Sequence, residues 1–266
     1  MRTTQNFPLR SSPGATPSVP LPFMPPPAPV PPAPDPDTAT PLILGEAEPF
    51  GVGGRRLCYV HPTDPGKCVK VLRHDDQRTV RLAKTRFKNF RREYDNNTHE
   101  MRILLQLEKT LGGAMAQHLP RCYGMHPTDK GPGLVLDLVR DHDGRISRSV
   151  RELITLGKDL ALLRPAFDEL GAFLLRHRIV TRHIHDHNIA ASDHGDGRFT
   201  FYIIDGLGDP AWLPFRRWCP PLARAGIQKR LDRAWPRFEA LAAKGGVSRD
   251  LIENSSWDQG MLRHRD

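Results

Sequence analysis

Cysteine is scarce in this sequence, and its cysteines are far apart. The chain of 266 residues contains four of them, and no two form a Cys-x-x-Cys pair. They are Cys58, Cys68, Cys122 and Cys219. This spacing excludes the common zinc-binding and dithiol redox motifs. We therefore expect reduced thiols and a cytoplasmic protein.

Long hydrophobic runs are also missing. No apolar stretch approaches the roughly 20 residues that a membrane helix requires, and no apolar core followed by a small-residue cleavage site opens the chain. We expect neither a membrane span nor a secretory signal. Acidic residues are outnumbered by basic ones, which gives a formal net charge of +9. A basic balance favours nucleotides, nucleic acids or anionic surfaces as partners without choosing among them.

Proline, in contrast, is abundant and unevenly distributed. About half of the 26 prolines precede residue 42. Because proline fixes φ and has no backbone donor, residues 1–41 are predicted to be a disordered tail with local polyproline II structure. We favour a plain extension over a ligand for an aromatic-lined groove. Residues 42–266 are predicted to form the folded body.

Hydrophobic patterning in this body predicts strands first and helices later. The strands are expected at 56–60 and 67–72, where alternation places Cys68 and Lys70 on one face and Val69 and Val71 on the other. A helix follows over residues 87–111, and a short strand over 134–139.

The second half reads as mainly helical. A wide apolar stripe runs over residues 153–178, where Pro165 is expected to mark the junction of two helices, and a basic helix covers residues 224–242. This order predicts an α+β fold with a small strand-rich lobe, about residues 42–139, and a helical lobe, about 140–242, followed by a C-terminal tail. A cleft between two such lobes is a usual place for a ligand site.

One lysine of the first lobe is a candidate for binding an anion. Lys70 lies in the middle of an apolar strand, where a lysine is costly to bury unless it meets a negative group. Glu100 opens an apolar helical run thirty residues later and is a candidate partner for it, with Glu93 as a competitor. Gly51 and Gly53 precede the first strand, and glycines let a backbone approach phosphate oxygens closely.

Two polar residues of the second lobe are candidate metal ligands. Asp205 ends the apolar run FYIID and is followed by glycine, and Asn188 stands seventeen residues earlier in a polar loop. An alternative metal site uses His183, His185 and His187, whose alternation would place three imidazoles on one face of a strand. An exposed polar loop is the favoured interpretation of the histidines.

The chain resembles the YrbL family, bacterial proteins that are named for the PhoP regulatory network and related to protein kinases. The resemblance covers about residues 50–238 and rests on LCYVHPTDPGKCVKVL, GPGLVLDLVRDHDGRIS, RIVTRHIHDHNIAA and IIDGLGDPAWLPFRRWC. It implies a protein-kinase-like two-lobed fold that binds ATP and Mg²⁺ between its lobes. Lys70 would then contact the phosphates, and Glu100 would pair with this lysine and orient it. Asn188 and Asp205 would bind the metal ion. The Leu136–Val139 segment, with Asp137 and Val139, would read adenine through backbone groups.

The sequence departs from the pattern of active kinases at one position. Five residues before the metal-binding asparagine, active kinases carry an aspartate that accepts the substrate hydroxyl's proton. His183 occupies that position here, and Asp186 is the nearest carboxylate. We therefore keep three hypotheses open: a phosphotransferase acting on an unknown protein or small molecule, a catalytically inactive pseudokinase acting as a regulatory module, and, with less support, a basic nucleic-acid-binding protein. For the last, the basic C-terminal half lacks a recognised DNA-binding spacing and reads as a solvated helix face.

Overall fold

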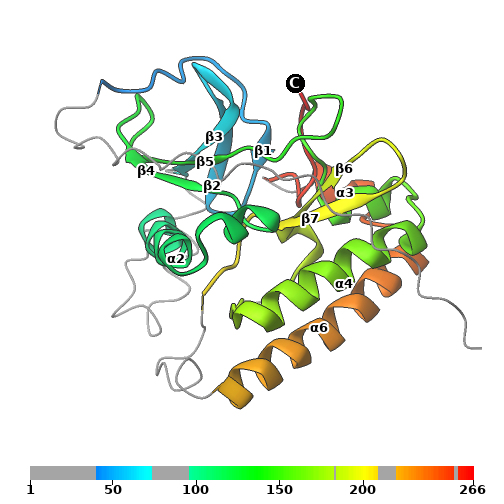
Figure 1. Ribbon diagram of the computed structural model, residues 1–266. Coiled ribbons are helices and arrows are strands. Elements are labelled where there is room, and N and C mark those ends of the chain that lie inside the picture. Colours follow the sequence, from blue (N-terminus) through cyan, green and yellow to red (C-terminus); the bar gives the residue numbers. More distant parts are fainter. Residues whose placement is uncertain (1–39, 74–95, 183, 209–219, 255–256) are drawn as a thin grey trace, which may run out of the picture.

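Figure 1 shows the computed structural model, in which an antiparallel sheet stands beside a group of helices. The structure describes residues 40–73, 96–182, 184–208, 220–254 and 257–266. The predicted tail up to residue 39, and residues 87–95 of the first predicted helix, lie outside the described residues.

Five strands form the sheet, in the order β1-β2-β3-β5-β4. They are β1 (Gly51–Val52), β2 (Arg56–His61), β3 (Asp64–Leu72), β4 (Cys122–His126) and β5 (Gly133–Asp137). Within β3, Lys70 lies opposite Cys58 on one side and Leu134 on the other. Because β3 has a hydrogen-bonded neighbour on each side, the position of Lys70 is fixed by both.

The two faces of β3 have different surroundings, as the alternation of the sequence predicts. Val69 and Val71 belong to a small apolar cluster on one face, together with Leu44 and Val135. On the other face Cys68 belongs to the main core, and it lines a cavity together with Lys70. Successive side chains of a strand point to opposite faces, so the charged residue of β3 shares the face that meets the helical part. The prediction is confirmed.

One helix, α2 (Asn96–Leu111), packs against the sheet and contacts β3, β4 and β5. Leu104 is fully buried, and Glu100, one turn earlier on the same side of the helix, is buried as well. The predicted helix is therefore present over its described part. The 3₁₀ helix η1 (Gly112–Gln117) follows α2 and leads to β4.

The remaining helices form a second layer. They are α3 (Val150–Thr155), α4 (Leu160–His177), α6 (Pro220–Ala243) and α7 (Arg249–Glu253). α4 and α6 lie side by side (Figure 1), and the ring of Phe167 stands 5.1 Å from that of Trp235 and 5.7 Å from that of Phe238. Among the residues that the structure describes, each helix is too short or too polar to span a bilayer.

Pro165 does not mark a helix junction, contrary to the sequence-based expectation. The junction lies earlier, where Gly157 adopts a positive φ of 78° after α3 and Asp159 caps α4 by accepting a hydrogen bond from the amide of Ala161 at 2.9 Å. Both are strong boundary signals. Pro165 lies inside α4 on an exposed surface, where water can replace the hydrogen bond that proline cannot donate.

A two-stranded hairpin lies against α4. After the 3₁₀ helix η2 (Asp186–Asn188), β6 (Ile189–Asp193) pairs with β7 (Phe199–Ile203). Phe201 is fully buried, which anchors the strand that leads to Asp205. The predicted order of asparagine, apolar strand and aspartate is confirmed, and the hairpin supplies the connection between them.

The last described residues return to the sheet. Leu262 forms an antiparallel bridge with Gly51, and the amide of Arg263 donates to the carbonyl of Phe50 at 2.9 Å. In Figure 1 the C-terminal end, drawn in red, accordingly lies beside β1 and far from α6. The sequence alone assigned no element to this tail.

Candidate functional site

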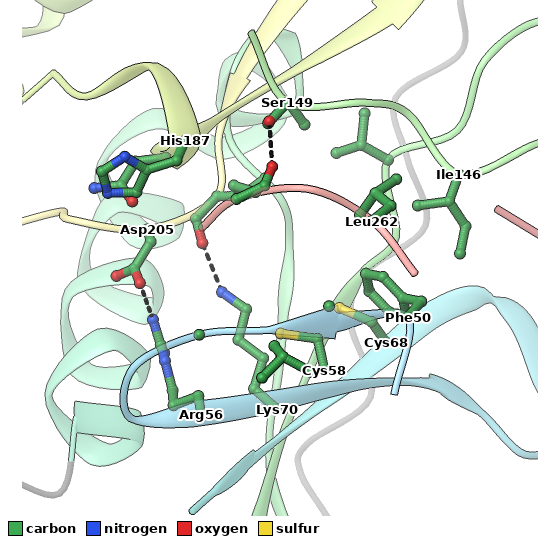
Figure 2. A pocket seen from close by; sticks show the side chains of 18 of the residues that line it. Phe50, Arg56, Cys58, Cys68, Lys70, Ile146, Ser149, His187, Asp205 and Leu262 are labelled. Atoms are coloured by element: carbon green, nitrogen blue, oxygen red, sulfur yellow. Dashed lines mark hydrogen bonds and ion pairs between the residues drawn. The ribbon is translucent and has the colours of Figure 1, made fainter. Parts of the chain in front are cut away.

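A cavity of about 360 Å³ lies between the sheet and the helical part, a volume at the lower end of the range for small-molecule sites. Its lining comes from both layers and from the returning C-terminal segment. Figure 2 shows that its two ends differ: Lys70, Arg56 and Asp205 gather at one end, and Phe50 and Leu262 at the other.

Lys70 and Glu100, which the sequence predicted to be partners, form an ion pair at the charged end. Lys70 Nζ lies 2.9 Å from Glu100 Oε1 and also donates to the carbonyl of Ile204 at 2.6 Å. Both residues are buried. Burial disfavours the charged ammonium, but the Glu100 and Asp205 carboxylates together raise the pKa of Lys70 above its ordinary value. The strand thus presents a fixed cation to the cavity. The competitor Glu93 lies outside the described residues.

Arg56 connects this pair to Asp205, although no pattern in the sequence predicted a role for it. Arg56 Nη1 contacts Glu100 Oε2, and Arg56 Nη2 lies 2.6 Å from Asp205 Oδ2. Arg56 is buried at the start of β2. Burial opposes its charge, yet Asp205 and Glu100 together raise the pKa of Arg56 well above its ordinary value. No sequence signal marked it, because its partners are far away along the chain.

Asp205 sits where the chain turns after β7. Its Oδ1 accepts a hydrogen bond from the amide of Gly206 at 2.6 Å, and Gly206 adopts a positive φ of 84° that suits glycine. The side chain borders the cavity and is 51% exposed. Desolvation by the surrounding protein atoms disfavours the charged carboxylate. The positive charges of Arg56 and Lys70 nevertheless hold the pKa of Asp205 well below its ordinary value. Asp205 is therefore ionised at neutral pH.

Asn188 is held beside this aspartate. Its carbonyl accepts a hydrogen bond from the amide of Ile204 at 2.9 Å, and both Asn188 and Asp205 line the cavity. Mg²⁺ is commonly bound by one or two protein oxygens together with phosphate oxygens and water. The pair fits such a shared site. Within the described ranges, no group of three His, Cys, Asp or Glu side chains could hold a metal ion.

Gly51 and Gly53 line the cavity near the turn between β1 and β2. A Cβ atom at Gly51 would lie 3.6 Å from Cys58 Cβ, and one at Gly53 would lie 3.4 Å from the Arg56 carbonyl. The fold itself therefore leaves room for a small side chain at both positions. Their role as phosphate contacts stays a prediction.

Asp137 and Val139 also line the cavity, where β5 ends. The side chain of Asp137 points toward β4 and accepts hydrogen bonds from the Arg121 amide and the Tyr123 hydroxyl, both at 2.9 Å. The Val139 carbonyl accepts from the Ser147 amide at 3.0 Å. These groups already make hydrogen bonds within the protein, so an adenine base would have to share them or bind to other backbone groups of the segment. The role of this segment in binding adenine stays a prediction.

Asp186 is held by Arg151 in a two-pronged ion pair, with Nε–Oδ2 at 2.8 Å and Nη2–Oδ1 at 2.9 Å. His187 Nδ1 lies 3.4 Å from Asp186 Oδ1. Burial opposes the carboxylate, but His187 and Arg151 outweigh it and hold its pKa well below the ordinary value. A carboxylate in this state is a weak proton acceptor. The other candidate base, His183, lies outside the described residues.

Within the histidine-rich loop, Asp186–Asn188 form the 3₁₀ helix η2 rather than a strand. The rings of His185 and His187 stack with centroids 5.1 Å apart and planes 12° apart. Because His183 lies outside the described residues, the three-histidine metal site stays a prediction.

The opposite end of the cavity is apolar. Phe50, Cys58, Cys68, Ile146 and Leu262 line it (Figure 2). Burial raises the pKa of Cys68 to about 12 and also raises that of Cys58, so both thiols are neutral at neutral pH. Nothing in the hydrophobic pattern identified this end, because it combines residues from five separate segments.

The basic residues of the C-terminal half are spread along α6. Arg224, Lys229, Arg233 and Arg237 are exposed, whereas Phe238 on the opposite side is buried. This is the solvated helix face expected from the sequence. Trp218, Arg216 and Arg217, which belong to the same prediction, lie outside the described residues.

Comparisons with known proteins agree on one family. The model of the family described as PhoP regulatory network protein YrbL matches residues 42–241. The uncharacterised YrbL proteins of Escherichia coli (strain K12) and Shigella flexneri are each 29% identical to this chain over 219 residues, which cover 80% of this chain and 94% of theirs. The matched region contains the sheet, the hairpin and all charged residues of the cavity. The chain therefore belongs to the YrbL family of PhoP regulatory network proteins.

Proposed function

We propose that the chain has a protein-kinase-like two-lobed fold and binds ATP with Mg²⁺ in the cavity between its lobes. The observation that carries this proposal is the convergence of Lys70 of β3 and Asp205, which follows β7, on one end of a cavity whose other end is apolar, with Glu100 of α2 paired to the lysine. A nucleotide has the matching polarity, with anionic phosphates on one side and a flat base on the other.

Each charged residue has a distinct task in this proposal. Lys70, aimed by Glu100, binds phosphate oxygens, and Asn188 and Asp205 hold the metal ion. Bound there, Mg²⁺ supplies charge neutralisation for the phosphates and orients them. Arg56 can exchange Asp205 for a phosphate oxygen, because guanidinium binds both kinds of anion with similar geometry.

In the phosphotransferase form of the proposal, a substrate hydroxyl oxygen bonds to the γ-phosphorus while the bond from that phosphorus to the β,γ-bridging oxygen breaks. The hydroxyl proton passes to a base, and ADP leaves. His183 is the candidate base by its position in the sequence. Asp186, ionised and held by Arg151, is better suited to orienting the hydroxyl than to accepting its proton.

The engagement of Asp186 favours the second candidate function, a pseudokinase. The nearest carboxylate to the expected base position is already neutralised by Arg151. A pseudokinase would bind nucleotide in the same cavity and act as a regulatory interaction module without turnover. The two functions predict equal nucleotide binding and differ only in the formation of ADP and a phosphorylated product.

The first test is the melting temperature of the full chain with and without ATP and Mg²⁺. A ligand that binds only the folded state at about one hundred times its Kd adds about 2.7 kcal/mol, which corresponds to a rise of roughly 5–10 °C for a domain of this size. We expect the rise to disappear in Lys70→Met and Asp205→Asn. The exposed Lys109→Met and Asp250→Asn provide matched controls that keep it.

Two further results complete the test. ADP formation above the level of Lys70→Met would favour the phosphotransferase, and its absence would favour the pseudokinase. No change of melting temperature at millimolar ATP, in a chain that melts cooperatively, would refute nucleotide binding in this cavity.

A further inference from the structure

Residues 257–265, here called the strap, run along the cavity and contribute to its lining. On the helical side, the Ser149 hydroxyl donates to the Gly260 carbonyl at 2.5 Å, and Arg151 Nη1 donates to the Gln259 carbonyl at 3.0 Å. The amide of Leu262 donates to Glu152 Oε2 at 3.2 Å. The strap is thus held to the helical wall mainly by hydrogen bonds between side chains of that wall and the strap backbone.

On the sheet side, the strap behaves as a short additional edge strand. Leu262 pairs with Gly51, and the amide of Arg263 donates to the carbonyl of Phe50 at 2.9 Å. Arg265 then returns to the helical wall, where Nε donates to the carbonyl of Ile146 at 2.9 Å and Nη2 contacts Asp141. The strap therefore ties the two walls together across the cavity.

The side chain of Leu262 lies in the apolar end, next to Phe50 and Ile146 (Figure 2). It packs on the edge of the main core but stays partly exposed. This is the end that a nucleobase would occupy if its phosphates met Lys70, since an apolar, water-poor surface is what a flat base requires. A base bound there would lie against Leu262, so this side chain limits the space that the base can use.

The strap also fits closely at one glycine. Gly260 adopts a positive φ of 87°, and a Cβ atom there would lie 2.4 Å from His187 Cβ. Any side chain at this position would push the strap away from the loop that carries Asn188. The position of the strap therefore depends on glycine at residue 260, and a single added methyl group is enough to disturb it.

We propose that the strap is an autoinhibitory segment, in which Leu262 narrows the apolar end of the cavity and must move away before a nucleotide binds fully. The inference rests on the proposed nucleotide site. Its physical basis is that a binding-competent state populated only in part lowers the apparent affinity by that fraction. The strap can open locally, because hydrogen bonds and half-buried side chains, rather than a deeply buried core residue, hold it.

The test measures the Kd of ATP with Mg²⁺ for the full chain and for two variants that release the strap in different ways. Leu262→Ala shortens the side chain that narrows the apolar end, and Gly260→Ala adds a methyl group that collides with His187. We expect both to bind ATP about tenfold more tightly or better. Two independent variants guard against a defect of folding in either one.

Matched controls separate release of the strap from trivial effects. Leu251→Ala makes the same change at an exposed leucine of α7. Gly245→Ala places alanine at a φ of 75°, with nothing within 4 Å of the new Cβ atom, and so reproduces the backbone strain without the collision. Both controls are expected to bind ATP as the unaltered chain does.

Hydrogen exchange supplies a second readout. The amides of Leu262 and Arg263, protected by Glu152 and Phe50, are expected to exchange faster when ATP is bound. Equal Kd values in all five proteins, with unchanged exchange at these amides, would overturn the strap proposal and leave the nucleotide site standing. Absence of ATP binding in every protein, including the two released variants, would overturn both.

Discussion

Arg56 Nη2 lies 2.6 Å from Asp205 Oδ2 and closes an alternating row of charges that runs Lys70, Glu100, Arg56, Asp205. Two cations and two carboxylates come from four segments, and the row carries no net charge. Each member is stabilised by a neighbour of opposite sign, and three of them, Lys70, Glu100 and Arg56, are buried, whereas Asp205 is half exposed. A phosphate group that enters here must therefore take over contacts that the protein already makes, and Arg56 is the member best placed to exchange one anion for another.

Arg56 is expected to be important for stability as well as for binding. Its removal leaves Glu100 buried with only part of its counter-charge, and losing one partner of a buried ion pair typically costs about 3–5 kcal/mol. We expect Arg56→Gln to lower the free energy of unfolding by about 3 kcal/mol in urea denaturation at neutral pH. Arg55→Gln, at the exposed neighbouring position, should change it by less than about 0.5 kcal/mol. Equal losses in the two variants would contradict the buried network.

Asp186 predicts how stability depends on acid. Its pKa in the folded chain is held well below the ordinary value by His187 and Arg151 against the effect of burial. A carboxylate with a depressed folded pKa stabilises the fold above its unfolded pKa, about 4, and this contribution is lost as the pH falls toward the folded value. We expect Asp186→Asn to flatten the decline in unfolding free energy below about pH 5.

The partner of Asp186 offers a matched comparison. Arg151→Met should flatten the same acid decline, because the folded pKa of Asp186 then moves back toward or above its ordinary value. Arg164→Met removes an exposed arginine that pairs with Asp168 at 2.9 Å in α4, and screening by water should make its effect small. Unfolding curves recorded from about pH 7 to about pH 3 measure both. An unchanged acid decline in Arg151→Met would refute the assignment.

The thiols report on the cavity without any assay of activity. In a Cys219→Ser background the remaining thiols are Cys58 and Cys68, which line the cavity, and Cys122, which does not. Burial raises the pKa of Cys68 to about 12 and that of Cys122 to about 11, so both should react slowly with an aromatic disulfide near neutral pH. Bound ATP should slow the labelling of Cys58 and Cys68 further and leave Cys122 unchanged. Equal protection of all three would indicate general stiffening instead of occupancy of the cavity.

Several features followed from local pattern alone. The alternation around Lys70 set which face of β3 carries the charge, and the apolar run before Asp205 set the strand that delivers it. The helix boundary predicted at Pro165 is wrong. The boundary is set by Gly157, just after α3, and by the capping residue Asp159, whereas Pro165 is tolerated inside α4 because its side of the helix faces water. Local signals of this kind compete, and their balance depends on which side of a helix is buried.

By itself, the sequence determined the order and the type of the elements, the faces of β3 and the family, because these depend on residues that are close together along the chain. The tertiary structure alone decided that Arg56 joins Glu100 to Asp205, that Arg151 neutralises Asp186, and that Leu262 lines the apolar end of the cavity. Each of these contacts joins residues 35 to more than 200 positions apart. Hydrophobic periodicity carries no information about such pairs, since it reports only which face of an element is buried and not which distant charge or backbone group will meet it.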